Sequence, residues 1–292
     1  MHRKANGAVA TMLGAGAYPW MQYYGRSGQP FSESEAMART AACPGIALWE
    51  GFLPETEEQA RGLGEAAAAT GLRCVSSYAN ARLHEADGWR GTADDLLRRA
   101  EWVLPLGLSV LVVNPEPISW GAADADKDDA QLRTQAAAMN DLGARLRGVG
   151  VTLVYHTHHM EMRQAAREFH HTLRATDPAN VALCLDAHWV YRGAGNSHVA
   201  LEDIVGMYAE RVRSLHLRQS VGGVWSETFT ASGDIDYGWI ADTLRGVGFS
   251  GPVVLEQARE AATPETISAD DALRQSADEA ARLFTVTNGV RI

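Results

Sequence analysis

Disulfide pairs and membrane-length apolar runs are the first features that this 292-residue chain lacks. Cys43, Cys74 and Cys184 are an odd number of widely spaced cysteines, and no two of them form a CxxC pair. Such cysteine usage is typical of reduced thiols in a cytoplasmic protein rather than of a disulfide framework. No apolar run approaches the length that crosses a bilayer, so we expect no membrane partner.

Basic residues are also scarce. The chain has 26 Lys and Arg against 36 Asp and Glu, which gives a formal net charge of −10. An acidic protein repels a phosphate backbone, and no local basic stripe offsets this repulsion, so we expect no nucleic-acid partner. The first residues are basic, but the apolar run after them is short and interrupted by Gly14 and Gly16, unlike a secretory signal. These features predict a cytoplasmic protein.

Short apolar runs alternate eight times with longer amphipathic segments. The strands that we expect are Ala8–Leu13, Ile46–Glu50, Arg73–Ser77, Ser109–Asn114, Val151–His156, Val181–Asp186, Ser214–Leu217 and Pro252–Glu256. The middle strands are almost continuously apolar, as in a parallel sheet that is buried on both faces. Helical spacing is clearest in residues 129–147, where Leu132, Ala136, Met139, Leu142 and Leu146 share one face.

This alternation without hairpin turns predicts parallel strands joined by helices. Eight such units in fewer than 300 residues favour a closed (β/α)₈ TIM barrel over an open sheet. No linker or low-complexity segment divides the chain, so we expect a single domain over residues 1–292.

Ligand-type side chains collect at the carboxyl ends of four successive expected strands, where barrel enzymes carry their active sites. They occur in Tyr155-His156-Thr-His158, Asp186-Ala-His188, His216-Leu-Arg218 and Leu255-Glu256-Gln257. Strand side chains alternate, so His156 and His158 point the same way, as do Asp186 and His188, and His216 and Arg218. A single histidine at a strand end is more often a hydrogen-bonded structural residue than a metal ligand, and a single carboxylate there is often a helix cap. Four consecutive strand ends of this type predict a site for Mn²⁺, Co²⁺, Zn²⁺ or Fe²⁺.

These segments, with Glu161, Gly233-Asp-Ile-Asp-Tyr237 and Val253-Val-Leu-Glu256, resemble the sugar phosphate isomerase/epimerase family of xylose isomerase-like barrels. The His-x-His strand looks most like that of inosose dehydratase relatives. The resemblance implies a metal-dependent barrel that removes a proton next to the carbonyl of a small sugar or cyclitol. It places Asp186, His216 and Glu256 among the metal ligands, with His156 where relatives usually have Glu. It also places Arg218-Gln219 where relatives often carry Lys-Asp.

Proton abstraction next to a ketone needs a base and a positive charge near the developing enolate oxygen. His158 or His188 is the expected base or its conjugate acid, and Arg218 is expected to hold a substrate oxygen. Glu161 is a weaker candidate, because we expect it to lie too far out on its loop. Trp120, Trp189 and Trp225 fall near the active face, where such rings either stack on a sugar or pack into the core.

Several functions stay open at this stage. The leading hypothesis is a dehydratase or lyase, and the alternative is a ketose isomerase or epimerase that shares the enolate step. An abasic-site endonuclease is disfavoured by the acidic charge and because Asp234-Ile-Asp236 lacks the histidine such an enzyme uses. A non-catalytic sugar-binding barrel is the third alternative. No phosphate-binding nest is evident, which favours an unphosphorylated substrate, and the sequence leaves open whether the protein is a homo-oligomer.

Overall fold

A closed barrel of eight parallel strands forms the centre of the computed structural model, which describes residues 12–122 and 124–284. The strands follow one another around the barrel in chain order, as the sequence predicts. They are β1 (Leu13–Gly16), β2 (Leu48–Phe52), β3 (Arg73–Ala81), β4 (Val110–Pro115), β5 (Thr152–Tyr155), β6 (Val181–Asp186), β7 (Val212–Leu217) and β10 (Val253–Leu255).

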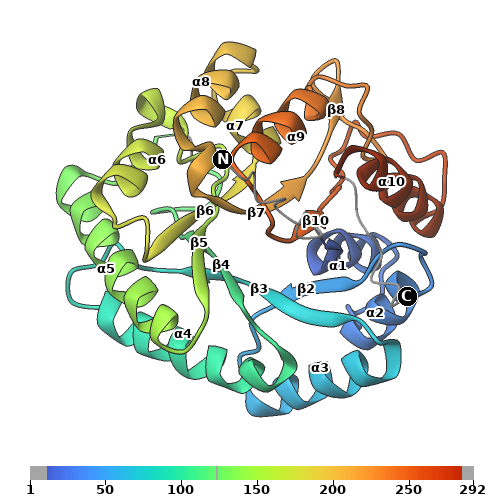
Figure 1. The fold of residues 1–292 in the computed structure, drawn as a ribbon, viewed down its shortest axis with the longest axis horizontal. Coiled ribbons are helices and arrows are strands. Elements are labelled where there is room, and N and C mark those ends of the chain that lie inside the picture. Colours follow the sequence, from blue (N-terminus) through green and yellow to red (C-terminus); the bar gives the residue numbers. More distant parts are fainter. Residues whose placement is uncertain (1–11, 123, 285–292) are drawn as a thin grey trace, which may run out of the picture.

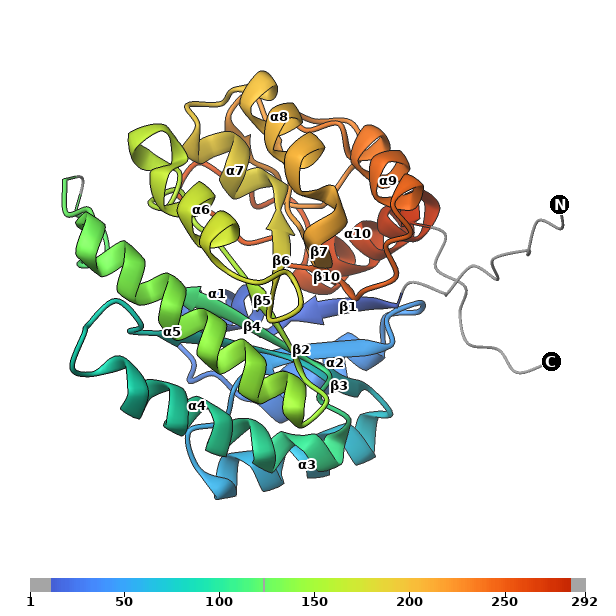
Figure 2. The same ribbon diagram turned by 60° about the vertical axis from the view of Figure 1, so that its left-hand side comes forward.

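Helices surround the strands on all sides (Figure 1), and α3, α4 and α5 lie side by side along one flank (Figure 2). The helices are α1 (Ala17–Arg26), α2 (Glu33–Ala41), α3 (Glu57–Thr70), α4 (Trp89–Val103), α5 (Asp129–Gly148), α6 (Arg163–Ala175), α7 (Ala187–Gly193), α8 (His198–Tyr208), α9 (Tyr237–Gly246) and α10 (Ala269–Phe284), with short 3-10 turns η1 (Leu104–Leu106) and η2 (Ala209–Arg211). The five residues expected on the inner face of α5 are all buried. The (β/α)₈ prediction is confirmed.

The inside of the barrel changes from apolar to polar along the strands. Val112, Val154 and Cys184 belong to a small apolar cluster on β4, β5 and β6, separate from the larger core under the helices. Side chains of one strand face the same side at every second residue. The same inward rows therefore continue to His156 and Asp186 at the carboxyl ends, where the site forms.

The first strand is the one that the sequence places wrongly. Residues 8–11 of the expected strand lie outside the described residues, and β1 instead runs over Leu13–Gly16. Gly14 and Gly16 look like strand breakers in the sequence, yet Gly14 lies in register with Leu48 of β2. A Cβ atom at Gly14 would come 2.8 Å from the Leu48 Cβ atom, so glycine permits this close packing.

A hairpin also corrects the expectation that the chain has none. β8 (Ser220–Val221) and β9 (Val224–Trp225) pair antiparallel beyond the carboxyl end of β7. Gly222 and Gly223 form its turn, and both have positive φ angles. A Gly-Gly turn makes a hairpin as readily as an Asn-Gly turn does.

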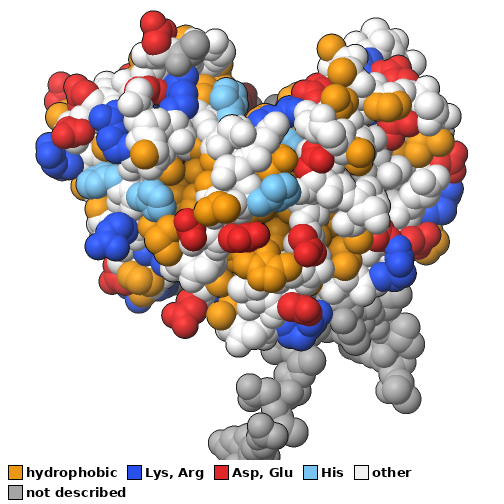
Figure 3. Space-filling model, turned by 90° about the horizontal axis from the view of Figure 1, so that it is seen from above, with side chains coloured by type: hydrophobic (Ala, Val, Ile, Leu, Met, Phe, Trp, Pro, Cys, Tyr) orange, Lys and Arg blue, Asp and Glu red, His pale blue; other side chains and the backbone are white. Residues whose placement is uncertain are grey.

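The surface carries charges of both signs. Lysine and arginine side chains lie among aspartates and glutamates on the side drawn in Figure 3, with no continuous basic stripe there. Within the described ranges, no helix combines the length and the apolar character needed to cross a bilayer.

Candidate metal centre and active site

Four side chains converge at the carboxyl end of the barrel. One ligand atom from each lies within 4.8 Å of the ligand atoms of the other three, and all four residues are buried. They are the four ligands expected from the sequence: His156, Asp186, His216 and Glu256. Two of the distances are 3.8 Å, from His156 Nε2 to Asp186 Oδ2, and 3.2 Å, from His216 Nδ1 to Glu256 Oε2.

Several ligand atoms in this cluster lack hydrogen-bond partners among the described residues. Asp186 ends β6 and caps α7, because its Oδ1 accepts a 3.0 Å hydrogen bond from the Trp189 backbone N–H. Its Oδ2 atom and both ring nitrogens of His156 are buried with no hydrogen-bond partner among the described residues. Buried polar atoms are rarely left unpaired, and a nitrogen–oxygen donor set of this kind suits Mn²⁺, Co²⁺, Zn²⁺ or Fe²⁺. The residues present therefore fit a divalent cation.

Two further charged side chains adjoin the cluster. Glu50 of β2 places its Oε1 atom 2.8 Å from His216 Nε2, and Arg218 donates a 2.7 Å hydrogen bond to Glu256. Arg218 is only 2% exposed, so it is not the solvated surface ion that an arginine after a strand often is. When the histidines are neutral, the carboxylates of Glu50, Asp186 and Glu256 and the guanidinium of Arg218 give a net charge of −2. One divalent ion would balance that charge.

The charges shift the acidity of the cluster. Burial alone would raise the pKa of Glu256, but His216 and Arg218 hold it well below its usual range. For Asp186, burial is likewise outweighed by Arg218 and His156, and the net pKa is lowered. Both carboxylates are therefore ionised at neutral pH, the form that binds a cation.

His158 lies beside the cluster and faces the open mouth of the barrel. Its ring centroid is 4.9 Å from that of His156 and 5.4 Å from those of Trp120 and Trp189. Burial, followed by the charge of His156, lowers the His158 pKa well below its ordinary value. A neutral imidazole at this place can accept a proton.

Glu161 supports the loop that carries His158. It is 1% exposed, accepts a 2.7 Å hydrogen bond from the His158 backbone N–H, and accepts a 3.1 Å hydrogen bond from Asn114. Glu161 is buried rather than far out on its loop, but it does not line the cavity at the barrel mouth. Both of its oxygens are engaged in holding the loop.

His188 has a different environment from His158. It is fully buried against Trp189 and Trp225, with ring centroid distances of 6.1 and 5.5 Å. Burial lowers its pKa to about 4. Unlike His158, it does not line the cavity at the barrel mouth.

A cavity of about 430 Å³ opens above the cluster. Its base includes Glu50, Arg218, Glu256 and His158, and much of its wall is apolar or aromatic. These wall residues are Tyr18, Met21, Phe52, Tyr78, Trp120, Met160 and Trp189. Among these wall residues, the sequence pointed only to Trp120 and Trp189. The volume lies within the usual range of ligand pockets, about 300–1,000 Å³. Trp225 does not line this cavity and packs over Arg218, its ring centroid 4.6 Å from the guanidinium carbon.

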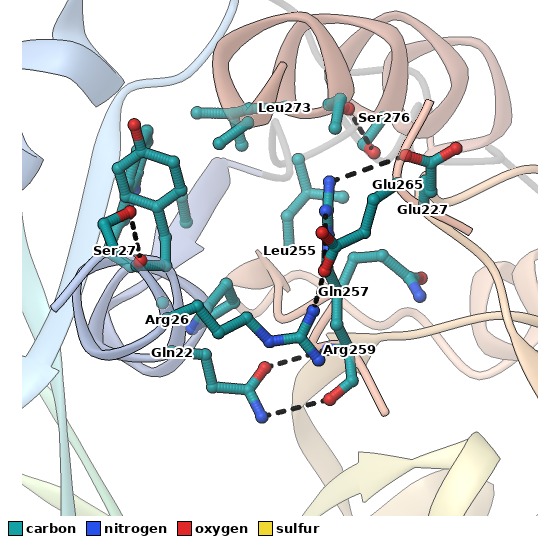
Figure 4. A pocket seen from close by; sticks show the side chains of 17 residues that line it. Gln22, Arg26, Ser27, Glu227, Leu255, Gln257, Arg259, Glu265, Leu273 and Ser276 are labelled. Atoms are coloured by element: carbon teal, nitrogen blue, oxygen red, sulfur yellow. Dashed lines mark hydrogen bonds and ion pairs between the residues drawn. The ribbon is translucent and has the colours of Figure 1, made fainter. Parts of the chain in front are cut away.

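Another cavity, of about 260 Å³, lies between α1 and α10 (Figure 4). Its charged side chains pair with one another: Arg26 and Arg259 both contact Glu265, and Arg259 also lies 3.7 Å from Glu227. The side chain of Gln22 donates a hydrogen bond to the Arg259 carbonyl and accepts one from the Arg259 backbone N–H. Because its polar groups are already satisfied and it lacks the metal-ligand cluster, we do not assign the active site to it.

The Asp234-Ile-Asp236 segment and Gln219 have structural roles. Asp234 accepts hydrogen bonds from Ser220 and from the backbone of Gly222 and Gly223, which holds the β8–β9 hairpin. Asp236 caps α9. Gln219, where relatives often have Asp, is buried and bonded to the backbone of residues 220, 230 and 235.

The comparisons with known proteins agree with this architecture. The model of the xylose isomerase-like TIM barrel family matches residues 36–283, and the chain belongs to this family. It is 28% identical over 148 residues to the inosose dehydratase of Lacticaseibacillus casei, an alignment that covers 46% of this chain and 49% of that protein. The chain thus spans about half the length of the curated relatives it matches.

Solved structures extend the likeness over nearly the whole chain. A sugar phosphate isomerase/epimerase from Parabacteroides distasonis matches with a TM-score of 0.72 and 15% identity, covering 95% of this chain and 100% of that chain. The 3-keto-D-glucoside 4-epimerase of E. coli matches with a TM-score of 0.64 and 14% identity, covering 94% and 99%. At such identities the likeness shows a shared fold.

Proposed function

We propose that this protein is a divalent-metal-dependent dehydratase or lyase that acts on an unphosphorylated keto sugar or keto-cyclitol, with residues 1–292 forming one domain. The observation that carries the proposal is a buried two-histidine, two-carboxylate cluster with unpaired ligand atoms at the base of an aromatic-walled cavity. The partial match to inosose dehydratases supports the type of reaction.

The cation would be held by four residues: His156, Asp186, His216 and Glu256. When bound, it supplies positive charge beside the oxygen that becomes negative during enolate formation. Mn²⁺, Co²⁺, Zn²⁺ and Fe²⁺ all accept such a nitrogen and oxygen donor set.

His158 is the residue that we assign to proton transfer. It lines the cavity beside the cluster, whereas His188 is enclosed by two tryptophans and serves as the second candidate. Arg218 is assigned to holding a substrate oxygen. Its Nε and Nη1 groups are buried and have no hydrogen-bond partner among the residues described, although Nη2 is bonded to Glu256.

The chemistry proceeds through an enolate. His158 takes the proton from the carbon next to the carbonyl, and the electron pair of the broken C–H bond moves toward the carbonyl oxygen. In a dehydratase the pair then returns to form a C=C bond, and the hydroxyl on the next carbon leaves, taking up the proton that His158 holds to become water. In an epimerase a second acid delivers a proton to the opposite face of the same carbon while His158 keeps the first, and no bond to oxygen breaks.

The cavity lining supports an unphosphorylated substrate. Arg218 is the only lysine or arginine lining the cavity in the described part of the chain, and its charge is shared with Glu256. A phosphate group normally requires several free donors or cations. The aromatic wall instead suits the apolar face of a sugar or cyclitol ring.

Metal content is the first test. We expect about one equivalent of Mn, Co, Zn or Fe in the purified protein and its loss in Asp186→Asn and His216→Ala. Asn at position 186 keeps a helix-capping side chain, so loss of metal in that variant reports on the carboxylate rather than on folding. Asp236→Asn, at the cap of α9, is the matched control and should keep its metal. Wild-type protein that neither contains nor binds any of these ions would rule out the metal-dependent mechanism and favour a sugar-binding barrel.

Incubation with keto-inositols and keto sugars in D₂O separates the reaction types. A product lighter by one water indicates the dehydratase, whereas deuterium uptake with recovery of an isomer indicates the epimerase or isomerase. The likeness to solved epimerases keeps that second reaction as the alternative. Cleavage of abasic DNA is not expected from a protein with a net charge of −10.

A further inference from the structure

A second cavity adjoins the mouth of the barrel. It has a volume of about 420 Å³, and its walls include His159, Arg163, Trp189, Arg192, Trp225 and Glu260. His159 and Trp189 also line the 430 Å³ cavity above the metal-ligand cluster. The two cavities therefore meet at this pair of side chains, and a ligand larger than one sugar ring can extend from one into the other.

The charges in the second cavity are already balanced. Arg163 forms a 2.8 Å ion pair with Asp126 and donates a 2.7 Å hydrogen bond to the Ala122 carbonyl. Arg192 is bonded to both oxygens of Glu260, at 2.8 and 3.1 Å. A phosphate or carboxylate would have to break one of these pairs, so the cavity favours a neutral ligand.

Hydrogen-bond donors in the same walls lack acceptors. The indole N–H groups of Trp189 and Trp225 and the Nε–H of Arg163 are buried, with no hydrogen-bond partner within residues 12–122 and 124–284. Proteins rarely leave buried donors unpaired, and all three donors belong to residues that line this one cavity, so small side-chain rotations would let them reach a ligand that supplies oxygen acceptors. Together with the indole rings, these donors suit a hydroxyl-rich ring.

We propose that the second cavity binds the second ring of a two-ring glycoside whose first, reacting ring occupies the mouth of the barrel. The identity of the first ring rests on the proposed function, whereas the second-ring site rests on the geometry of the second cavity. The preferred ligand is then a glycoside rather than a free monosaccharide or a free cyclitol.

Calorimetric titration of the metal-loaded protein tests this proposal. The probes are methyl β-glucoside and the β-linked glucose disaccharides joined at O2, O3, O4 or O6. We expect at least one disaccharide to bind about tenfold more tightly than methyl β-glucoside, the effect of one or two newly satisfied hydrogen bonds. If no disaccharide binds more tightly than methyl β-glucoside, the proposal is wrong. If glucose 6-phosphate binds more tightly than every disaccharide, the second cavity is an anion site and the proposal is also wrong.

Two variants remove unpaired donors with little change in shape. Trp225→Phe keeps an aromatic ring but lacks the indole N–H, and Arg163→Lys keeps the charge opposite Asp126 but lacks the Nε–H. Each should lower the ratio of disaccharide to methyl glucoside affinity by about fivefold. Trp102→Phe, on α4, is the matched control and should leave the ratio unchanged. An unchanged ratio in both test variants would overturn the proposal, and because metal content and D₂O exchange are measured separately, it would leave the proposed function standing.

Discussion

Glu50 and His216 meet across the interior of the barrel, with 2.8 Å between Glu50 Oε1 and His216 Nε2. Their strands, β2 and β7, are separated in the sheet by β1 and β10. Gly16 of β1 lies in register with Glu50. Ser76 donates a hydrogen bond to the other oxygen of Glu50. Since both Glu50 oxygens are engaged, Glu50 is placed to orient a metal ligand rather than to be one.

Removing Glu50 should weaken metal binding without removing any ligand. Two lone pairs repel at 2.8 Å, so the contact between Glu50 Oε1 and His216 Nε2 is favourable only when Nε2 carries the proton. The other ring nitrogen of His216, Nδ1, is then free to face the cluster. Loss of such an outer partner typically costs about 10- to 100-fold in metal affinity. We expect this weakening in Glu50→Ala and a smaller one in Glu50→Gln, measured as the dissociation constant for Mn²⁺ or Co²⁺ by competition with a chelator.

Glu33→Gln is the control for the change in net charge. Glu33 is a largely buried carboxylate that accepts a 2.9 Å hydrogen bond from the indole of Trp49, the residue before Glu50. It makes no contact with the metal-ligand cluster and should leave the dissociation constant unchanged. Equal metal affinity in Glu50→Ala and wild type would show that His216 needs no partner at Nε2.

Glu33 also provides a prediction about stability and pH. Burial raises its pKa above the usual value, and the Trp49 hydrogen bond offsets only part of that rise. The folded protein therefore binds this proton more tightly than the unfolded chain does, so the contribution of Glu33 to stability is greatest at low pH and is lost as pH rises through the folded pKa. Glu33→Gln stays neutral and should unfold at a higher temperature than wild type at about pH 7. This advantage should vanish toward about pH 4, and a difference in melting temperature that is constant with pH would contradict the assignment.

A left-handed turn at the start of α6 predicts an unusual effect of glycine. Gln164, Ala165 and Ala166 have φ angles of 52°, 57° and 56°, and Ala165 is exposed. The left-handed conformation costs a residue with a Cβ atom roughly 1–2 kcal/mol. Ala165→Gly should therefore stabilise the protein by about 0.5–1 kcal/mol, after allowing for the greater entropy of glycine in the unfolded chain.

The matched control is Ala137→Gly on the exposed side of the regular helix α5. There glycine should destabilise the protein by about 0.5–1 kcal/mol, the ordinary cost inside a helix. Chemical denaturation of the two variants beside wild type measures both effects. Destabilisation of equal size in both variants would mean that residue 165 is helical in solution.

The features that could be predicted from the sequence are those governed by strand periodicity. His156, Asp186, His216 and Glu256 could be brought together because the carboxyl ends of neighbouring parallel strands meet at one edge. The role of Glu50 could not be predicted, because its contact with His216 joins β2 and β7, two strands that are not neighbours in the sheet. The position of β1 could not be predicted either, because a glycine that packs against Leu48 looks in the sequence like one that ends a strand.

The burial of the functional side chains also could not be predicted from the sequence. An arginine after a strand is usually solvated, and only the packing of Trp189 and Trp225 over Arg218 reveals that this one is enclosed. Likewise, His158 and His188 are equivalent in the sequence, each two residues after an expected ligand. The loop held by Glu161 and the tryptophans around His188 are what distinguish them.

The contrast between these two histidines gives the last prediction. His158→Gln should lower the rate of deuterium incorporation or water loss by about 10²- to 10⁴-fold, the usual contribution of a general base, with metal content unchanged. His188→Gln should have a much smaller effect on the rate, because its ring lies behind Trp189 and Trp225 and does not reach the cavity. The two variants carry the same substitution at the same distance in sequence from a ligand, so each controls for the other. A large loss of activity in His188→Gln with little change in His158→Gln would transfer the proton-transfer role to His188 and would require Trp189 to move when the substrate binds.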